Sequence, residues 1–104
     1  MKGKITMNEE KDIKELVKLA YNALDEKKAS DISIIDISKL SVVADYFIVA
    51  SADNIRQTAA LCDNVEDTLG RAGYEPKQIE GRSSANWILM DYRDVIIHIF
   101  DKEN

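Results

Sequence analysis

Residues 84–101, SANWILMDYRDVIIHIFD, decide the fold of this chain. Two apolar runs, residues 87–90 and 95–100, flank a short polar segment at residues 91–94. Such a pattern predicts a β-hairpin, and the rest of the chain has to be arranged around it.

We expect the two-residue loop of this hairpin at Tyr92-Arg93, with Asp91 opposite Asp94. The expected pairs are then Met90 with Val95, Ile88 with Ile97, and Asn86 with Ile99. Because side chains alternate between the two sides of a strand, these pairs share one side of the ribbon. The other side carries Leu89 with Ile96 and Trp87 with His98, with Phe100 beside them. Both sides are apolar, so one must pack on the protein's own helices and the other needs a cover as well.

Bulk properties predict one domain of a soluble, cytoplasmic protein. The chain has 104 residues, of which 45% are hydrophobic and 32% charged, with a single cysteine. No apolar run reaches the roughly 20 residues of a membrane-spanning helix, and no secretory signal opens the chain. A net charge of −5 weighs against binding to a nucleic-acid backbone and is compatible with a basic protein partner.

Hydrophobic periodicity predicts two helices and three further strands. One helix is expected over about residues 8–28, and a second from Asp53 or Asn54 to about Ala72. Strands are expected over residues 32–37, 46–50 and 77–80, the last of them at an edge. The order α-β-β-α-β-β-β, with a strand–helix–strand unit in its middle, predicts a two-layer α+β fold with a mixed five-stranded sheet.

Finer expectations accompany these elements. Residues Thr6 and Glu9 fit a capping box at the start of the first helix. The strand at residues 46–50, YFIVA, is a continuous apolar run typical of a strand covered on both faces. The expected core face of the second helix consists of Ile55, Ala59, Cys62, Val65, Leu69 and Ala72, and Gly73 is its expected stop.

Residues for catalysis or metal binding are scarce. His98 is the only histidine, so a multi-histidine metal site is ruled out, and a packing or interface role is favoured over a catalytic base. Cys62 lies on an apolar helix stripe, which favours a core thiol over a nucleophile. The carboxylates Asp31, Asp36 and Asp45 fall at strand ends, where solvated side chains are commoner than metal ligands. We therefore predict no enzyme, no metal and no cofactor.

The motif DYFIVASADNIRQ at residues 45–57, followed by NWILMDYRDVIIHIF at residues 86–100, resembles the Iojap and YbeB family, the ribosomal silencing factors (RsfS). The resemblance implies a homodimer with a mixed α/β fold related in shape to nucleotidyltransferases. It also implies binding to the large ribosomal subunit on its protein L-fourteen. Such binding obstructs joining of the small subunit and lowers translation when nutrients are scarce. Family members usually have glycine in the hairpin turn, where this chain has Arg93, and tight turns favour glycine.

A protein that acts by obstruction needs a binding surface and no active site. The apolar face of the hairpin offers such a surface. An apolar centre with acid at its tip suits a basic ribosomal protein. The predicted partner-binding residues are Trp87, Leu89, Asp91, Tyr92, Asp94, Ile96 and His98. Burial of the same face within a homodimer is the alternative for that surface. The alternative functions are a nucleotidyltransferase-like enzyme and a dimeric scaffold with another protein partner.

Overall fold

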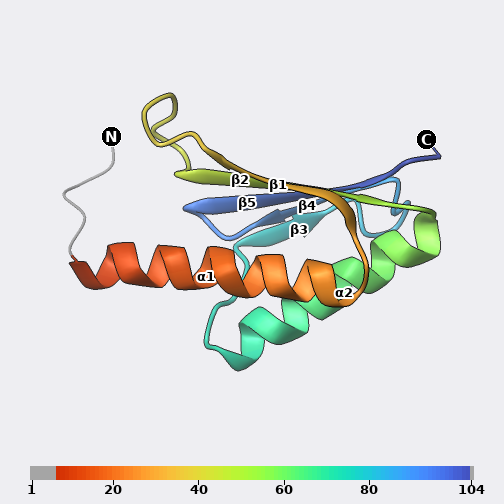
Figure 1. Ribbon diagram of the computed structural model, residues 1–104, viewed down its shortest axis with the longest axis horizontal. Coiled ribbons are helices and arrows are strands. Elements are labelled where there is room, and N and C mark those ends of the chain that lie inside the picture. Colours follow the sequence, from red (N-terminus) through yellow and green to blue (C-terminus); the bar gives the residue numbers. More distant parts are fainter. Residues whose placement is uncertain (1–6, 104) are drawn as a thin grey trace.

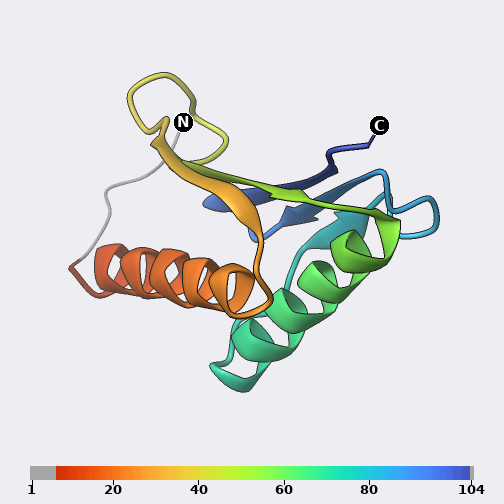
Figure 2. The same cartoon turned by 45° about the vertical axis from the view of Figure 1, so that its right-hand side comes forward.

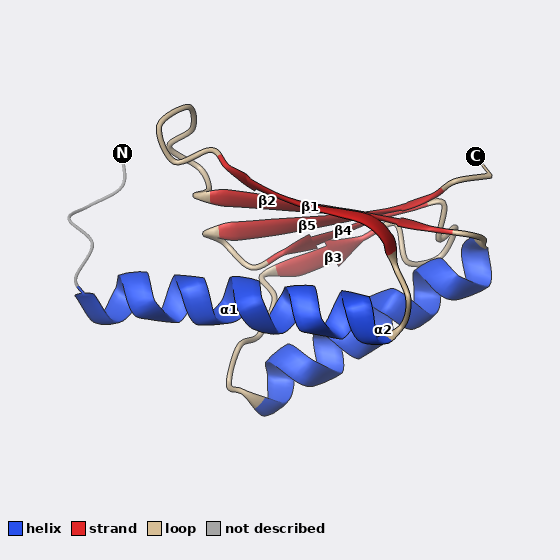
Figure 3. Ribbon diagram, in the orientation of Figure 1, coloured by secondary structure: helices blue, strands red, loops and turns tan. Residues whose placement is uncertain are grey.

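A computed structural model describes residues 7–103. It contains two helices and five strands in the predicted order (Figure 3). They are α1 (Met7–Glu26), β1 (Ser30–Asp36), β2 (Tyr46–Ala52), α2 (Ile55–Arg71), β3 (Gln78–Glu80), β4 (Trp87–Asp91) and β5 (Val95–Asp101). The expected capping box at Thr6 lies outside the described residues.

The strands form one mixed sheet in the order β1-β2-β5-β4-β3. The pair β2 and β5 is parallel, whereas β1–β2, β4–β5 and β3–β4 are antiparallel. Both helices lie on the same side of the sheet (Figures 1 and 2). The predictions of a mixed five-stranded sheet with two helices and of β3 as an edge strand are confirmed.

The core lies between the helices and the sheet, and the helical periodicity identifies most of it. Residues Leu16, Val17, Ala20 and Leu24 of α1 and Cys62, Val65 and Leu69 of α2 are buried there. Two residues predicted for this core are exposed instead, namely Ile55 at 48% and Ala72. Ile55 opens α2 and Ala72 follows its last residue. Periodicity gives the side of a helix that faces the core, but not how far along the helix the core extends.

The helix ends follow ordinary capping chemistry. The Asn54 side chain caps α2, because its Oδ1 accepts a hydrogen bond from the Gln57 amide at 2.8 Å. Gly73 has a φ of +94°, the left-handed conformation expected of a helix stop. Helix α1 ends at Glu26, before the predicted residue 28, where Lys28 already has a φ of +66°.

The hairpin is present, but our predicted register is wrong by two residues. Tyr92 lies opposite Val95, and its amide donates to the Val95 carbonyl at 2.9 Å, so the loop is Arg93-Asp94. The observed pairs are Asp91–Ile96, Met90–Ile97, Leu89–His98, Ile88–Ile99 and Trp87–Phe100. Because the period of a strand is two residues, this slip leaves the side chains of residues 87–91 and 95–100 on their predicted sides. Arg93, in place of the family's glycine, has a φ of +73°.

Candidate partner-binding face

One face of the sheet carries no helix, and we call it the open face (Figure 1). Strand alternation and the observed registers assign residues to it from all five strands. They are Ser33 and Ile35; Phe47, Val49 and Ser51; Ile96, His98 and Phe100; Trp87, Leu89 and Asp91; and Gln78 and Glu80. Its centre is apolar and aromatic, and its charged side chains lie toward β3.

Four aromatic rings form a cluster on the open face. The Trp87 ring stacks on Phe100 with centroids 5.5 Å apart and on His98 at 6.0 Å, while Phe47 meets His98 edge-on at 5.1 Å. Trp87 is 51% exposed, although indoles are large apolar groups that are usually well covered. Exposed apolar and aromatic patches are typical of interaction sites, so the open face is the candidate binding surface.

Trp87 and His98 are joined by a hydrogen bond as well as by stacking. The indole Nε1–H donates to His98 Nδ1 at 3.2 Å. Because Nδ1 accepts, the neutral imidazole carries its proton on Nε2. Partial burial lowers the pKa of His98 below its ordinary value of 6.5, so this neutral form predominates at pH 7.

Five of the seven predicted partner-binding residues lie on the open face: Trp87, Leu89, Asp91, Ile96 and His98. Tyr92 does not, because the shifted register turns it toward the helices, where only 5% of it is exposed. Asp94 lines a small pocket between the hairpin tip and α1, together with Asp12 and Tyr74. Tyr92 is therefore not part of the open face, and the binding role of Asp94 at the hairpin tip stays a prediction.

The sequence pattern missed Phe47 and Val49, which extend the open face across β2. Our reading of YFIVA as a strand covered on both faces is wrong, because Ile48 and Ala50 are buried whereas Phe47 and Val49 are partly exposed. Their place beside Ile96 and His98 follows from the parallel pairing of β2 with β5. No local pattern in the sequence predicts that β2 pairs with β5.

A further apolar segment stands next to this face. The connector between β1 and β2 rises on the side of the sheet away from the helices (Figures 1 and 2). Its side chains Leu40, Val42 and Val43 are exposed. The apolar surface on this side of the molecule is thus not confined to the strands.

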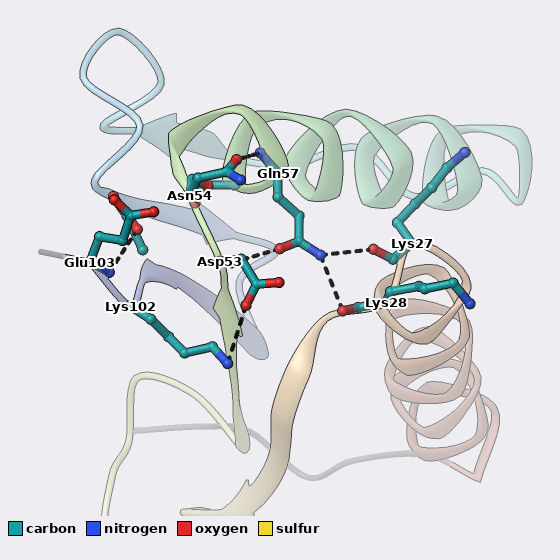
Figure 4. A network of polar contacts seen from close by, with 9 residues as sticks. Lys27, Lys28, Asp53, Asn54, Gln57, Lys102 and Glu103 are labelled. Carbon is teal, nitrogen blue, oxygen red and sulfur yellow. Dashed lines mark hydrogen bonds and ion pairs between the residues drawn. The ribbon is translucent and has the colours of Figure 1, made fainter.

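The polar end of the 45–57 motif holds segments of the fold together (Figure 4). Gln57 Nε2 donates to the carbonyls of Lys27 and Lys28 at 3.2 and 3.1 Å, just beyond the end of α1. Its Oε1 accepts from the Asp53 amide at 2.6 Å, and the Asp53 carboxylate pairs with Lys102 at 3.3 Å. These hydrogen bonds give Gln57 a structural role, because they join the end of α1 to the start of α2.

The three carboxylates at strand ends differ in their exposure to solvent. Asp31 and Asp36 are exposed, and Asp36 accepts hydrogen bonds from the amide and hydroxyl of Ser38, which lower its pKa. Asp45 was expected to be solvated, yet only 6% of it is exposed, because its amide donates to the Asp94 carbonyl and draws the strand start against the hairpin tip. Among the side chains of residues 12–103, no three histidine, cysteine or acidic groups gather as a metal site. No helix within residues 7–103 is long and apolar enough to cross a membrane.

Comparison with known proteins gives consistent matches over most of the chain. The profile of the family described as "Ribosomal silencing factor during starvation" matches residues 10–104. The ribosomal silencing factor RsfS of Bacillus subtilis is 36% identical over 90 residues, which are 86% of this chain and 76% of the relative. The RsfS of Chromobacterium violaceum is 40% identical over 88 residues, covering 85% and 72% of the two chains.

Solved structures match the fold as closely. A crystal structure of a Chromobacterium violaceum protein superposes with a TM-score of 0.84 at 39% identity, over 86% of this chain and 74% of the other. A crystal structure from Bacillus halodurans gives a TM-score of 0.82 at 32% identity, over 86% and 84%. At 39% and 32% identity, these proteins resemble the chain in sequence as well as in fold.

Proposed function

Because the chain belongs to the family of ribosomal silencing factors, we propose that it binds the large ribosomal subunit through the subunit's protein L-fourteen. Bound there, it obstructs joining of the small subunit and so lowers translation when nutrients are scarce. We place this role in the cytoplasm and assign it no cofactor, no direct contact with nucleic acid and no catalysed reaction. Obstruction of subunit joining requires only that the protein occupies space on the large subunit, and it involves no reacting group.

The open face is the observation that supports this proposal. It presents Trp87 as a half-exposed anchor, and tryptophan is enriched among the residues that dominate binding energies. Leu89 and Ile96 surround the aromatic cluster with aliphatic surface. Such a centre resembles the desolvated core of a protein–protein interface.

Charge supports a basic partner at this face. The carboxylates on it are those of Glu80 of β3 and Asp91 of β4, both toward one edge, and the whole chain carries a net charge of −5. A ribosomal protein seated on RNA is expected to be basic, so the acidic edge orients the encounter and the apolar centre supplies affinity. Binding should therefore weaken with added salt without being abolished by it.

Sedimentation with purified large subunits tests the proposal, with two variants of equal charge. Leu89→Asp places a carboxylate in the apolar centre, whereas Tyr21→Asp places one on an exposed position of α1. We expect the native protein and Tyr21→Asp to sediment with the subunits, and Leu89→Asp to stay in the supernatant. The native protein should also reduce joining when small subunits are added afterwards. Native protein that never sediments, or joining that is unaffected by it, contradicts the proposal.

We also propose that the free protein is a homodimer. The exposed side chains Leu40, Val42 and Val43 of the connector between β1 and β2 favour self-association beside the open face, because the same surface is removed from water in both copies. Light scattering at micromolar concentration should give about twice the 11.7 kDa of one chain. Observation of the single-chain mass alone rules the dimer out and leaves the ribosomal proposal standing.

A further inference from the structure

The only tryptophan and the only histidine of the chain are in contact on the open face. Trp87 lies opposite Phe100 and His98 lies opposite Leu89, so the two rings are diagonal neighbours across β4 and β5. Their hydrogen bond runs from the indole nitrogen to Nδ1 at 3.2 Å. The indole nitrogen can only donate, so the bond exists only while His98 Nδ1 has a lone pair.

Protonation of His98 removes that lone pair. Nδ1 then becomes a second N–H donor, which opposes the indole N–H instead of accepting from it. The same proton places a positive charge among the Phe47, Trp87 and Phe100 rings, whose stacked or edge-on contacts with His98 are 5.1 to 6.2 Å between centroids. Covering this charge with a partner costs more than covering the neutral ring.

Few charged groups face His98 from the surrounding strands. Its neighbours on β5 and β2 are Ile96, Phe100, Phe47, Val49 and Ser51, and none of them ionises near pH 7. On β4 the neighbours are Trp87, Leu89 and Asp91, and Glu80 of β3 lies beyond Leu89. Asp91 Oδ1 accepts from the Arg93 amide at 2.8 Å, so its hydrogen bond goes to the turn. Burial lowers the pKa of His98.

We propose that His98 is a positioning residue of the open face, whose neutral ring holds the Trp87 indole in its binding orientation and whose protonation weakens binding to the large subunit. This inference rests on the proposed function, to which it adds a proton dependence. Binding covers the ring further and so favours its neutral form, which means that the complex releases a proton as it forms. By linkage, affinity is highest above the pKa of His98 and falls as the pH drops through it, approaching tenfold per pH unit.

The free protein tests the first half of the proposal without any ribosome. A titration from about pH 7.5 to about pH 5.5 should change the fluorescence of the single tryptophan and the NMR shift of its indole N–H with one midpoint below 6.5. His98 ring resonances should titrate with the same midpoint. Trp87→Phe removes the donor that favours the neutral ring, so the histidine midpoint should rise. Histidine resonances that titrate while the tryptophan signals stay constant refute the positioning role.

Binding of purified large subunits at the two pH values tests the second half. We expect native affinity to fall on acidification, approaching tenfold per pH unit below the His98 midpoint. His98→Asn retains an acceptor near the Nδ1 position but cannot titrate, so the ratio of its affinities at the two pH values should stay near one, whatever its affinity at the higher pH. His98→Leu lacks the acceptor and should bind weakly at both. An equal loss for His98→Asn and the native protein on acidification overturns the inference.

The two proposals fail in distinguishable ways. Native protein that does not bind large subunits at either pH refutes the proposed function and the binding half of this inference, while the fluorescence titration still decides whether His98 positions Trp87. Native protein that binds equally at both pH values, with the His98 titration complete in the free protein, refutes the proton dependence and leaves the proposed function intact.

Discussion

Two neighbouring isoleucines of β5 test the assignment of the two sheet faces with the same chemical change. Ile97 is 0% exposed beneath the helices, whereas Ile96 lies partly exposed on the open face opposite Phe47. Replacement of Ile97 by alanine deletes three buried carbons, each worth about 0.8 kcal/mol, and leaves a cavity that adds to the loss. We expect Ile97→Ala to lower the free energy of unfolding by about 2–5 kcal/mol and Ile96→Ala by about 1 kcal/mol.

Thermal melts and subunit binding together give the readout. Ile97→Ala should melt at least about 10 °C below the native protein and Ile96→Ala about 5 °C below it. At a temperature where both are folded, Ile96→Ala should bind large subunits more weakly than Ile97→Ala. Equal melting temperatures, or weaker binding by Ile97→Ala, would show that the faces are assigned the wrong way round.

Further substitutions probe the hairpin and its surroundings. Trp87→Ala should cost about 2 kcal/mol in subunit binding, roughly thirtyfold in affinity, while Tyr21→Ala on α1 leaves binding unchanged; a titration that finds equal losses removes Trp87 as the anchor. Arg93→Gly should raise the free energy of unfolding by about 0.5–1 kcal/mol, because Arg93 has a φ of +73°; urea melts showing a decrease contradict this. Gly81→Ala should destabilise by about 3 kcal/mol or more, since its φ is +84° and a Cβ there overlaps the Trp87 carbonyl oxygen. At Gly73, with a φ of +94° and no atom within 4 Å, the same change should cost about 1 kcal/mol, and equal costs refute the overlap.

The sequence was sufficient for the order of elements and for the side of each hairpin residue, since both follow from local periodicity. It was insufficient for the register, because a period of two residues cannot distinguish alignments that differ by two. The burial of Tyr92 under the helices selects the observed alignment, and that contact joins parts of the chain far apart. A glycine at position 93 would have marked the turn, but Arg93 adopts the left-handed conformation without one.

The extent of the candidate face was underestimated for a similar reason. Trp87, Leu89, Ile96 and His98 belong to one hairpin, so their common side follows from alternation alone. Phe47 joins them only because β2 runs parallel to β5, a pairing between residues about fifty positions apart. Strand order is decided by the packing of the whole chain, and no local spacing encodes it.

The position of β5 has a consequence for how the protein comes into being. β5 follows every other strand in the chain, yet it lies between β2 and β4 and is the sole link between the β1–β2 pair and the β3–β4 pair. A nascent chain in which β5 is still inside the ribosomal exit tunnel holds two separate strand pairs with helices and no central strand to unite them. The sheet closes only after β5 emerges, and pairings so distant in sequence form slowly. The open face, which β2, β5 and β4 build together, is therefore complete only after β5 has left the tunnel.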